Sequence, residues 1–423
     1  FQTEQNYGAG LFPIWIEPGD FNGDGAADLA VANHNGNTVS LFLNSGDGSL
    51  APKADYPTGS GPSSIAVVDL NLDGRLDLVT ANFKTTNISV LLGKGDGTFQ
   101  AKVDIDAGSK PHAVAAGDLN KDGKTDLVVA NNGAANLSVL LGQGDGTFLT
   151  KVLYPAAASM NRLVVADFDG DGNLDVAVDG SEPLVGVLLG NGDGTLRAMA
   201  THATELRASD LQMGDFNGDG RPDLVVVDHY EGVSVLLNKG GGVFELIRTK
   251  AKFDHGVSLA IGDMNRDGRQ DLVVSTDAIS KVYVLLGNGN GTFQENSVPR
   301  YLPGYVISST LADLNRDGFL DLALVNYGND RVHVLTAVPS LTDDFSDGNI
   351  NGWIHYDPLA GVGGKRAIFE VVDGAYHIRA PLTPTLPPQV GPPRAGTFFP
   401  ANSYTDFEVS ADIVSWDDEA LAA

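Results

Sequence analysis

Residues 20–33 read DFNGDGAADLAVAN, which places Asp20, Asp24 and Asp28 within nine residues and directly before a hydrophobic run. Carboxylates roughly 5 Å apart repel each other by about 3 kcal/mol at an effective dielectric constant near 20. A chain that gathers three of them in one short loop therefore needs something to offset that repulsion.

The same stretch occurs seven times. The later copies begin at Asp69, Asp118, Asp167, Asp215, Asp263 and Asp313, at intervals of 48 to 50 residues. A nearly fixed period of this size indicates a repeat architecture. Many of the 54 acidic residues lie at fixed positions of this repeat, which argues against an acidic surface that serves solubility alone.

Each loop has Asp at position 1, Asn or Asp at 3, Asp at 5, Gly at 6, a variable residue at 7 and Asp at 9. Calcium binds six to eight oxygens, and oxygens at alternate positions curl around one point. Because position 7 varies freely, we expect it to contribute its backbone carbonyl. The predicted ligands are Asp20, Asn22, Asp24, Ala26 and Asp28; Asp69, Asn71, Asp73, Arg75 and Asp77; Asp118, Asn120, Asp122, Lys124 and Asp126; Asp167, Asp169, Asp171, Asn173 and Asp175; Asp215, Asn217, Asp219, Arg221 and Asp223; Asp263, Asn265, Asp267, Arg269 and Asp271; and Asp313, Asn315, Asp317, Phe319 and Asp321.

Calcium is favoured over magnesium because a flexible, carboxylate-rich loop suits the larger and less strictly octahedral ion. The loops contain no His or Cys, which disfavours transition metals. They are not EF-hands, since position 12 is Val31, Thr80 or Val129 rather than Glu. We expect up to seven calcium ions per chain; loops made of Asx turns without a metal are the alternative.

Each period also contains four strand-like segments. In the second period they are residues 62–70, 77–82, 88–93 and 98–105, and the last two are joined by a KGDG turn that predicts a tight hairpin. Four strands per period predict an all-β, seven-bladed propeller. The seventh period lacks a fourth strand, and residues 1–7 resemble one, so the N-terminal strand is predicted to close the ring and remove its exposed edges. The recurring GDG is interpreted as turn chemistry rather than as a second metal site.

The DxNxDGxxDL loop and the GDGTF turn resemble the FG-GAP (VCBS-type) repeat of the integrin alpha-chain propeller and of many secreted bacterial proteins. The resemblance implies that each acidic loop joins the first and second strands of a blade on the lower face and holds calcium there. Asp169 stands where the family usually has Asn. All seven repeats keep the motif here, whereas integrins keep it in only some blades, which favours a rigid calcium-dependent scaffold over an integrin-like partner.

The repeats assign residues 1–338 to the propeller and leave 339–423 as a β-rich segment. Within it, DDFSDGNINGW, FEVVDGAYHI and DFEVSADIV alternate apolar and polar residues. This segment resembles the opening of a concanavalin-like or laminin-G-like jelly roll, and it is too short for a complete one. A β-rich appendage packed on the propeller is the alternative.

The net charge of −27 argues against nucleic-acid binding, which requires a basic face. The chain has no cysteine and no run of 18 apolar residues, so neither a disulfide nor a membrane span is expected. It begins with Phe1 rather than Met, which suggests a removed leader or a fragment. We expect a secreted or cell-surface protein that is monomeric.

No GxSxG, HExxH or phosphate-binding loop is present, and no catalytic residue is assigned. The loops on the upper face, opposite the acidic loops, vary between repeats and are the predicted ligand site. The candidates are Trp15, His112, Arg162, Asp210, His229 and Tyr230, with His34, Phe83, His255 and Tyr327 in neighbouring loops. The predicted function is non-enzymatic adhesion or binding of an extracellular glycan or protein. The alternatives are a polysaccharide lyase that uses Arg162 and His112, and a purely structural scaffold.

Overall fold

The computed structural model describes most of the repeat region. The described residues are 4–204, 207–228, 232–249, 253, 255–277, 281–294, 300–302 and 304–337, together with four short strands between 354 and 398. Within these residues every regular element is a β-strand, and no helix is long and apolar enough to cross a membrane. The predicted all-β class is confirmed.

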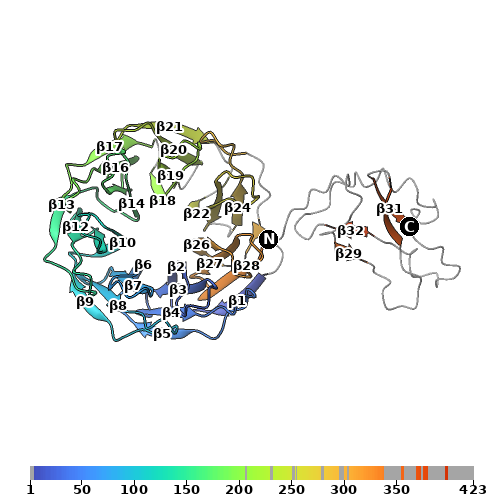
Figure 1. Cartoon of the computed structure of the whole chain (residues 1–423), viewed down its shortest axis with the longest axis horizontal. Coiled ribbons are helices and arrows are strands. Elements are labelled where there is room, and N and C mark those ends of the chain that lie inside the picture. Colours follow the sequence, from blue (N-terminus) through green and yellow to red (C-terminus); the bar gives the residue numbers. More distant parts are fainter. Residues whose placement is uncertain are drawn as a thin grey trace. The chain divides into compact units, whose positions relative to one another are not determined.

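The repeats form seven four-stranded sheets, which are the blades of a propeller (Figure 1). Blade one contains β2 (Pro13–Gly19), β3 (Asp28–Asn33), β4 (Thr38–Phe42) and β5 (Ala54–Pro57). Blade two contains β6 (Pro62–Val68), β7 (Asp77–Asn82), β8 (Asn87–Leu91) and β9 (Val103–Asp106). Blade three contains β10 (Pro111–Gly117), β11 (Asp126–Asn131), β12 (Asn136–Leu140) and β13 (Val152–Pro155). Blade four contains β14 (Leu163–Ala166), β15 (Asp175–Val178), β16 (Leu184–Leu188) and β17 (Ala200–Ala203).

The remaining three blades complete the ring. Blade five contains β18 (Ala208–Gly214), β19 (Asp223–Asp228), β20 (Val233–Asn238) and β21 (Phe244–Thr249). Blade six contains β22 (Gly256–Gly262), β23 (Asp271–Thr276), β24 (Lys281–Leu285) and β25 (Arg300–Tyr301). Blade seven contains β26 (Val306–Ala312), β27 (Asp321–Asn326), β28 (Arg331–Leu335) and, from the other end of the chain, β1 (Glu4–Gly8).

The N-terminal strand closes the ring as predicted. β1 pairs antiparallel with β28, in a register that runs from Glu4 opposite Leu335 to Gly8 opposite Arg331. Every blade is an antiparallel meander whose first strand is innermost in the ring (Figure 1). Because strands from the two ends of the repeat region share the sheet of blade seven, β28 is not left as an unpaired edge strand and the ring is closed.

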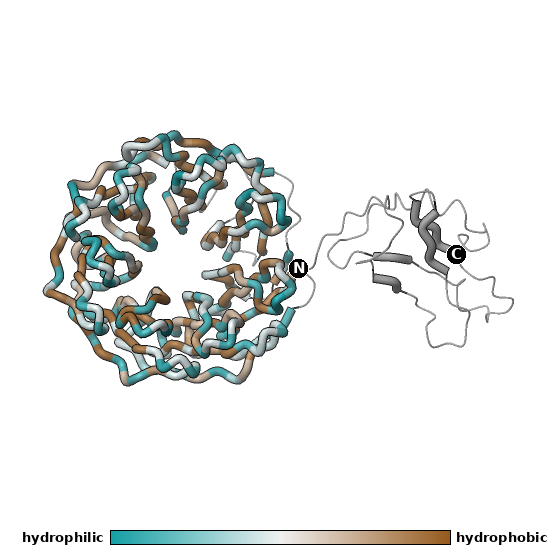
Figure 2. Tube along the Cα trace, viewed as in Figure 1, coloured by the Kyte–Doolittle hydropathy of each residue, from teal (hydrophilic) through white to brown (hydrophobic). Residues whose placement is uncertain are grey.

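The second strand of each blade is buried on both faces by the neighbouring blades, which explains why these strands read as almost continuous apolar runs. All six residues of β3, β7 and β11 are buried. Hydrophobic segments recur in every blade around the ring (Figure 2). One cluster joins Phe21 of blade one to Ile65 and Phe99 of blade two, with the two phenylalanine rings 5.8 Å apart. The core therefore lies between blades.

The fourth strands differ from the prediction. The predicted strand over 98–105 is divided into an isolated bridge between Gly93 and Phe99 and the strand β9, which begins only at Val103. Asp96 accepts a hydrogen bond from the backbone N–H of Thr98 at 2.9 Å, and the N–H of Lys94 donates to the Thr98 carbonyl at 2.9 Å, so the GDG segment forms the predicted tight turn. Its last glycine, Gly97, donates its N–H to the carbonyl of Phe21 in the preceding blade at 3.0 Å. The turn therefore helps to join blades.

The chain divides into two compact units, one of which is Thr3–Thr336. In the other, β29 (Ile354–Tyr356) pairs with β32 (Gly396–Phe398), and β30 (Ile368–Val372) pairs with β31 (Ala375–Arg379). The rest of 338–423 lies outside the described residues, so the jelly-roll interpretation stays a prediction.

Candidate functional site

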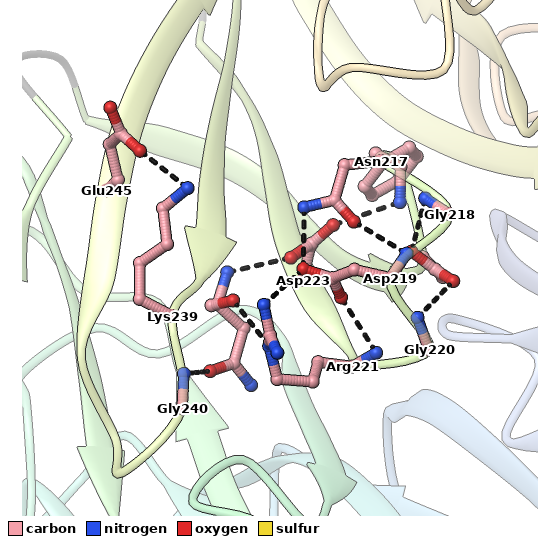
Figure 3. Close-up of polar contacts among 12 residues, drawn as sticks. Asn217, Gly218, Asp219, Gly220, Arg221, Asp223, Lys239, Gly240 and Glu245 are labelled. Carbon is pink, nitrogen blue, oxygen red and sulfur yellow. Dashed lines mark hydrogen bonds and ion pairs between the residues drawn. The ribbon is translucent and has the colours of Figure 1, made fainter.

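Each acidic loop joins the innermost strand of a blade to its second strand and wraps backbone N–H groups around carboxylates. In blade five, shown in Figure 3, the Asp215 carboxylate accepts hydrogen bonds from the backbone of Gly218, Asp219 and Gly220 at 2.8 to 3.1 Å. The Asn217 side chain accepts another from the Asp219 N–H at 3.0 Å. The side-chain oxygens at positions 1, 3 and 5 are thereby held on the inside of one turn of backbone.

The aspartate at position 9 has a structural role that the sequence analysis missed. Asp223 is fully buried and accepts hydrogen bonds from the N–H of Phe216 in its own loop, at 3.0 Å, and of Asn238 at the end of β20, at 2.7 Å. Burial raises the pKa of Asp223 to about 6, although both hydrogen bonds oppose that shift. The bond to position 2 recurs in all seven loops. Position 9 therefore ties each loop to its blade.

Blade four provides the test of whether the loops fit a metal ion. Carboxylate oxygens of Asp167, Asp169 and Asp175 all lie within 4.8 Å of one another. Two oxygens that share one calcium at 2.3 to 2.6 Å lie at most about 5 Å apart, so this set fits one ion. The hydrogen bonds within the loop are compatible with an ion, because each carboxylate oxygen can accept more than one interaction.

Arginine side chains also offset part of the loop charge. Arg316 of blade seven donates to the carbonyl of Asp24 in blade one at 2.7 Å and lies 3.1 Å from its carboxylate. Arg197 lies 3.8 Å from Asp169 and 3.6 Å from Asp171. These pairs are partly exposed and each contributes little, typically 0 to about 1 kcal/mol. Most of the repulsion between the carboxylates must therefore be offset by another positive charge.

Comparison with known proteins agrees with this geometry. No curated protein matches the chain significantly. A family profile described as an FG-GAP-like repeat matches five stretches, residues 20–80, 69–129, 118–178, 215–274 and 263–324, which together span more than half of the chain. The chain belongs to the FG-GAP-like repeat family.

Three solved structures resemble this FG-GAP propeller at low sequence identity. A crystal structure of BBS1N in complex with ARL6DN, soaked with mercury, has 12% identity and a TM-score of 0.58, and covers 81% of this chain and 98% of that one. The same complex soaked with lead has 13% identity and a TM-score of 0.54, with 79% and 96% covered. A lectin of Agrocybe aegerita that recognises non-reducing terminal N-acetylglucosamine has 19% identity and a TM-score of 0.47, with 78% and 90% covered. The first two likenesses establish the fold alone.

The FG-GAP propeller brings three of the predicted ligand-site residues together inside the ring. Seven equivalent residues, one from each blade, surround the axis of the propeller. They lie on the innermost strands or just before them, opposite the second strand of the blade, and are Trp15, Ser64, Ala113, Arg162, Asp210, Ser258 and Ser308. Arg162 donates to the buried Asp210 at 2.7 Å and stacks over the Trp15 ring at 3.6 Å. We call Trp15, Arg162 and Asp210 the channel cluster.

The same ring of positions also connects neighbouring blades. Asp210 accepts a hydrogen bond from the N–H of Leu259 in the next blade at 2.8 Å. The Ser64 hydroxyl accepts a hydrogen bond from the N–H of Val114, and the Ser258 hydroxyl accepts one from the N–H of Ser309, both at 3.1 Å. Asp210 therefore has a structural role in addition to its ion pair.

Two carboxyl groups beside the channel cluster were missed by the sequence analysis. Glu17 accepts a hydrogen bond from the Trp15 indole at 2.8 Å, and Asp179 is fully buried and accepts from the N–H groups of Asn161 and Arg162 at 2.7 and 2.9 Å. Burial raises the pKa of each carboxyl to about 7. Aligning the repeats on one another supplies the missing signal, because Asp179 occupies a strand position that is Ala32, Ala81 and Ala130 in blades one to three.

The opposite face from the acidic loops carries a continuous series of rings. It is formed where innermost strands begin and second strands end. Consecutive centroids lie 4.9 to 6.3 Å apart from Tyr305 and Tyr327 of blade seven through Phe12, His34 and Phe83 to His112 of blade three. We call these six residues the aromatic arc. Phe12 has φ of 56°, a conformation that bulky residues rarely adopt and that costs of order 1–3 kcal/mol.

Four of the other predicted ligand-site residues belong to the aromatic arc. His34, Phe83 and Tyr327 lie together in it, and His112 belongs to the arc rather than to the channel cluster. Burial lowers the pKa of His112 to about 4, so its imidazole is neutral at pH 7. Phe12 and Tyr305 were not predicted. His229 and Tyr230 lie outside the described residues, and their role stays a prediction.

Replacing Asp179 with asparagine is expected to make the protein less sensitive to alkaline pH. The folded chain keeps the Asp179 proton up to pH of about 7, whereas the unfolded chain loses it near pH 4, so wild-type stability falls as the pH rises through this window. The isosteric Asp179→Asn side chain keeps the acceptor oxygen and cannot ionise. We expect it to be nearly neutral at pH 4 and to stabilise by about 1–3 kcal/mol at pH 8. Thermal unfolding of both proteins across this range checks the difference, and parallel curves would contradict it.

Proposed function

We propose that this FG-GAP propeller is a non-enzymatic, calcium-stabilised module that binds an extracellular glycan or protein. It acts as a secreted or surface-exposed monomer in which the acidic loops hold calcium on one face and the opposite face captures the ligand. The ion supplies the positive charge that the clustered carboxylates require. Side chains at positions 1, 3, 5 and 9, and the carbonyl at position 7, are the groups that would hold it.

The aromatic arc is the observation that carries this proposal. Tyr305 is 51% exposed and Leu11, beside Phe12, is 62% exposed, so a contiguous part of this face presents apolar surface to solvent. Such patches on monomeric proteins commonly mark interaction sites. Aromatic rings bury a large area for a small loss of side-chain freedom, which suits them to a binding surface.

Polar groups beside the rings would orient a ligand. Lys110 lies 5.8 Å from the centre of the Phe83 ring, and Lys84 donates to the side chain of Asn35 at 2.9 Å. Both lysines are exposed, and they place positive charge on this face of a chain whose net charge is −27. A glycan or protein with polar and weakly acidic groups around an apolar surface matches this combination.

A lyase acting on acidic polysaccharide is the second candidate, because His112 is a neutral imidazole on the same face. Arg162 is a poor base, since a guanidinium is not deprotonated in proteins and this one already donates to Asp210. Incubation with pectic or other acidic polysaccharide distinguishes the two candidates. Release of unsaturated product that absorbs in the ultraviolet would support the lyase, whereas retention of unchanged polymer would support binding.

A glycan and matrix-protein array with calcium, and again with chelator, tests the proposed function. We expect at least one ligand to be retained with calcium and lost with chelator. Phe83→Ala should weaken that binding at least about tenfold, which corresponds to about 1.4 kcal/mol. The control is Leu153→Ala, which removes an exposed apolar side chain from the outer strand β13, away from the arc, and should leave binding unchanged. An array without hits would favour the structural scaffold, and equal effects of the two variants would exclude the arc as the binding surface.

A further inference from the structure

A pocket of about 340 Å³ lies inside the ring, next to the channel cluster and separate from the aromatic arc. Its walls come from the innermost strands β2, β18, β22 and β26, with Arg162 of blade four on one side. Ligand pockets in proteins range from about 300 to 1,000 Å³, so this one is at the small end. Its volume equals that of roughly ten water molecules, which is comparable to a single hexose.

The pocket is polar at positions where the other repeats are apolar. Glu17, Gln212 and Thr310 line it at one strand position. The equivalent residues of the other four blades are Ala66, Ala115, Val164 and Ala260. Ser258 and Ser308 add hydroxyl groups at the neighbouring ring position. Polar residues are thus concentrated on one side of the axis, which the repeat itself does not require.

Gln270 departs from the repeat in the same way. It lines the pocket at loop position 8, where three other blades carry Leu76, Leu174 and Leu320. Its side-chain oxygen packs over Gly214, much as those leucines pack over glycines of the preceding blade, and it has no hydrogen-bond partner among the described residues. A buried acceptor without a partner costs about 1–3 kcal/mol, a cost that leucine would avoid. The wall of the pocket therefore holds a polar group that packing between the blades does not require.

The charges around the pocket restrict the class of ligand. Its one basic residue, Arg162, is already paired with the buried Asp210. Glu17 adds a second carboxyl, so the wall offers no free positive charge to an anion. The remaining polar groups are hydroxyls and carboxamides, which both donate and accept hydrogen bonds. Such a wall suits an uncharged molecule that has several hydroxyl groups.

We propose that this pocket binds one uncharged, hydroxyl-rich molecule of about the size of a monosaccharide, with Gln212, Gln270 and Thr310 as hydrogen-bonding residues and Trp15 as part of the wall. This site is independent of the aromatic arc and of the larger ligand proposed for that face. It would select against acidic sugars, because a carboxylate would face Glu17 and Asp210 without a free cation.

Titration of the calcium-loaded full chain with glucose, galactose and mannose, followed by saturation-transfer NMR and calorimetry, tests this site. We expect at least one hexose to bind with 1:1 stoichiometry and a Kd on the order of 1 mM, and glucuronate to bind at least tenfold more weakly. Gln270→Leu should weaken hexose binding at least tenfold without lowering the melting temperature, since leucine is the residue that three other blades carry. Gln294→Leu makes the same change at an exposed position of blade six outside the pocket, and it should leave binding unchanged.

Three results would overturn the proposal. The first is that none of the three hexoses binds saturably. The second is that glucuronate binds as tightly as the hexoses, and the third is that Gln270→Leu and Gln294→Leu have equal effects on hexose binding. Phe83→Ala separates this site from the aromatic arc. If Phe83→Ala abolishes hexose binding and Gln270→Leu does not, the sugar binds to the arc, which overturns the pocket but not the proposed function. If only Gln270→Leu abolishes it, the pocket is supported even when the arrays yield no larger ligand.

Discussion

Removing calcium with a chelator is expected to lower the melting temperature of this protein by on the order of 10–25 °C. An ion present at 100 times its Kd stabilises the folded state by about 2.7 kcal/mol. Between three and seven such ions would contribute about 8 to 19 kcal/mol to the free energy of unfolding. Dividing this contribution by the unfolding entropy of a unit of this length gives the stated fall in melting temperature. The expected loss is large because, without the ion, the carboxylates at positions 1, 5 and 9 repel one another within every loop.

Differential scanning calorimetry with calcium, with chelator and with chelator followed by excess calcium measures this effect. We expect readdition of calcium to restore the original transition. Magnesium at the same concentration is the control ion, and it should restore less, since it demands an octahedral site and dehydrates reluctantly. A melting temperature that does not change in chelator would contradict calcium binding and favour loops made of Asx turns alone.

Replacing the position-9 aspartate of one blade is expected to destabilise the protein by about 3–5 kcal/mol. In blade three, Asp126 is fully buried and accepts hydrogen bonds from the N–H groups of Leu119 at 2.9 Å and Gly142 at 2.7 Å. Asp126→Ala leaves both buried donors unpaired, at about 1–3 kcal/mol each, and also removes one predicted calcium ligand. Urea unfolding at saturating calcium should show the loss, and the number of bound ions should fall by one.

Asp145→Ala is the matched control for that substitution. Asp145 belongs to the GDG turn of the same blade and accepts a hydrogen bond from the Thr147 N–H at 2.9 Å, but this bond is exposed to solvent. Water replaces an exposed bond, so the expected loss is at most about 1 kcal/mol, with no change in the number of bound ions. Equal losses for Asp126→Ala and Asp145→Ala would contradict the role assigned to position 9.

The ring and its closure were predictable because the repeat pattern is strong and periodic. Seven copies of the loop fixed the number of blades, and the missing fourth strand of the seventh repeat indicated that residues 4–8 would pair with β28. The fourth strands were predicted less well. Their residues lie on the outside of each blade, where apolar alternation is weak, and the GDG turn with its bridge at Phe99 delays β9 to Val103.

The candidate sites were predictable only in part. Trp15, Arg162 and Asp210 could be found because they are polar or aromatic residues at equivalent positions of different repeats. Their mutual contacts could not be predicted, since Arg162 belongs to blade four, whereas Asp210 belongs to blade five and Trp15 to blade one. Glu17 and Gln270 were missed because a single carboxyl or carboxamide is unremarkable until most of its repeat equivalents are seen to be apolar. The hydrogen bonds by which Asp126 ties its loop to the blade, in addition to its predicted role as a calcium ligand, also require the three-dimensional structure.

An anomalous-difference map from crystals grown with calcium would show directly whether the acidic loops hold the ion. We expect one peak in each acidic loop, up to seven per chain, with oxygen ligands at 2.3–2.6 Å from the side chains at positions 1, 3, 5 and 9 and the carbonyl at position 7. Acidic loops without any such peak in a well-ordered propeller would contradict this expectation.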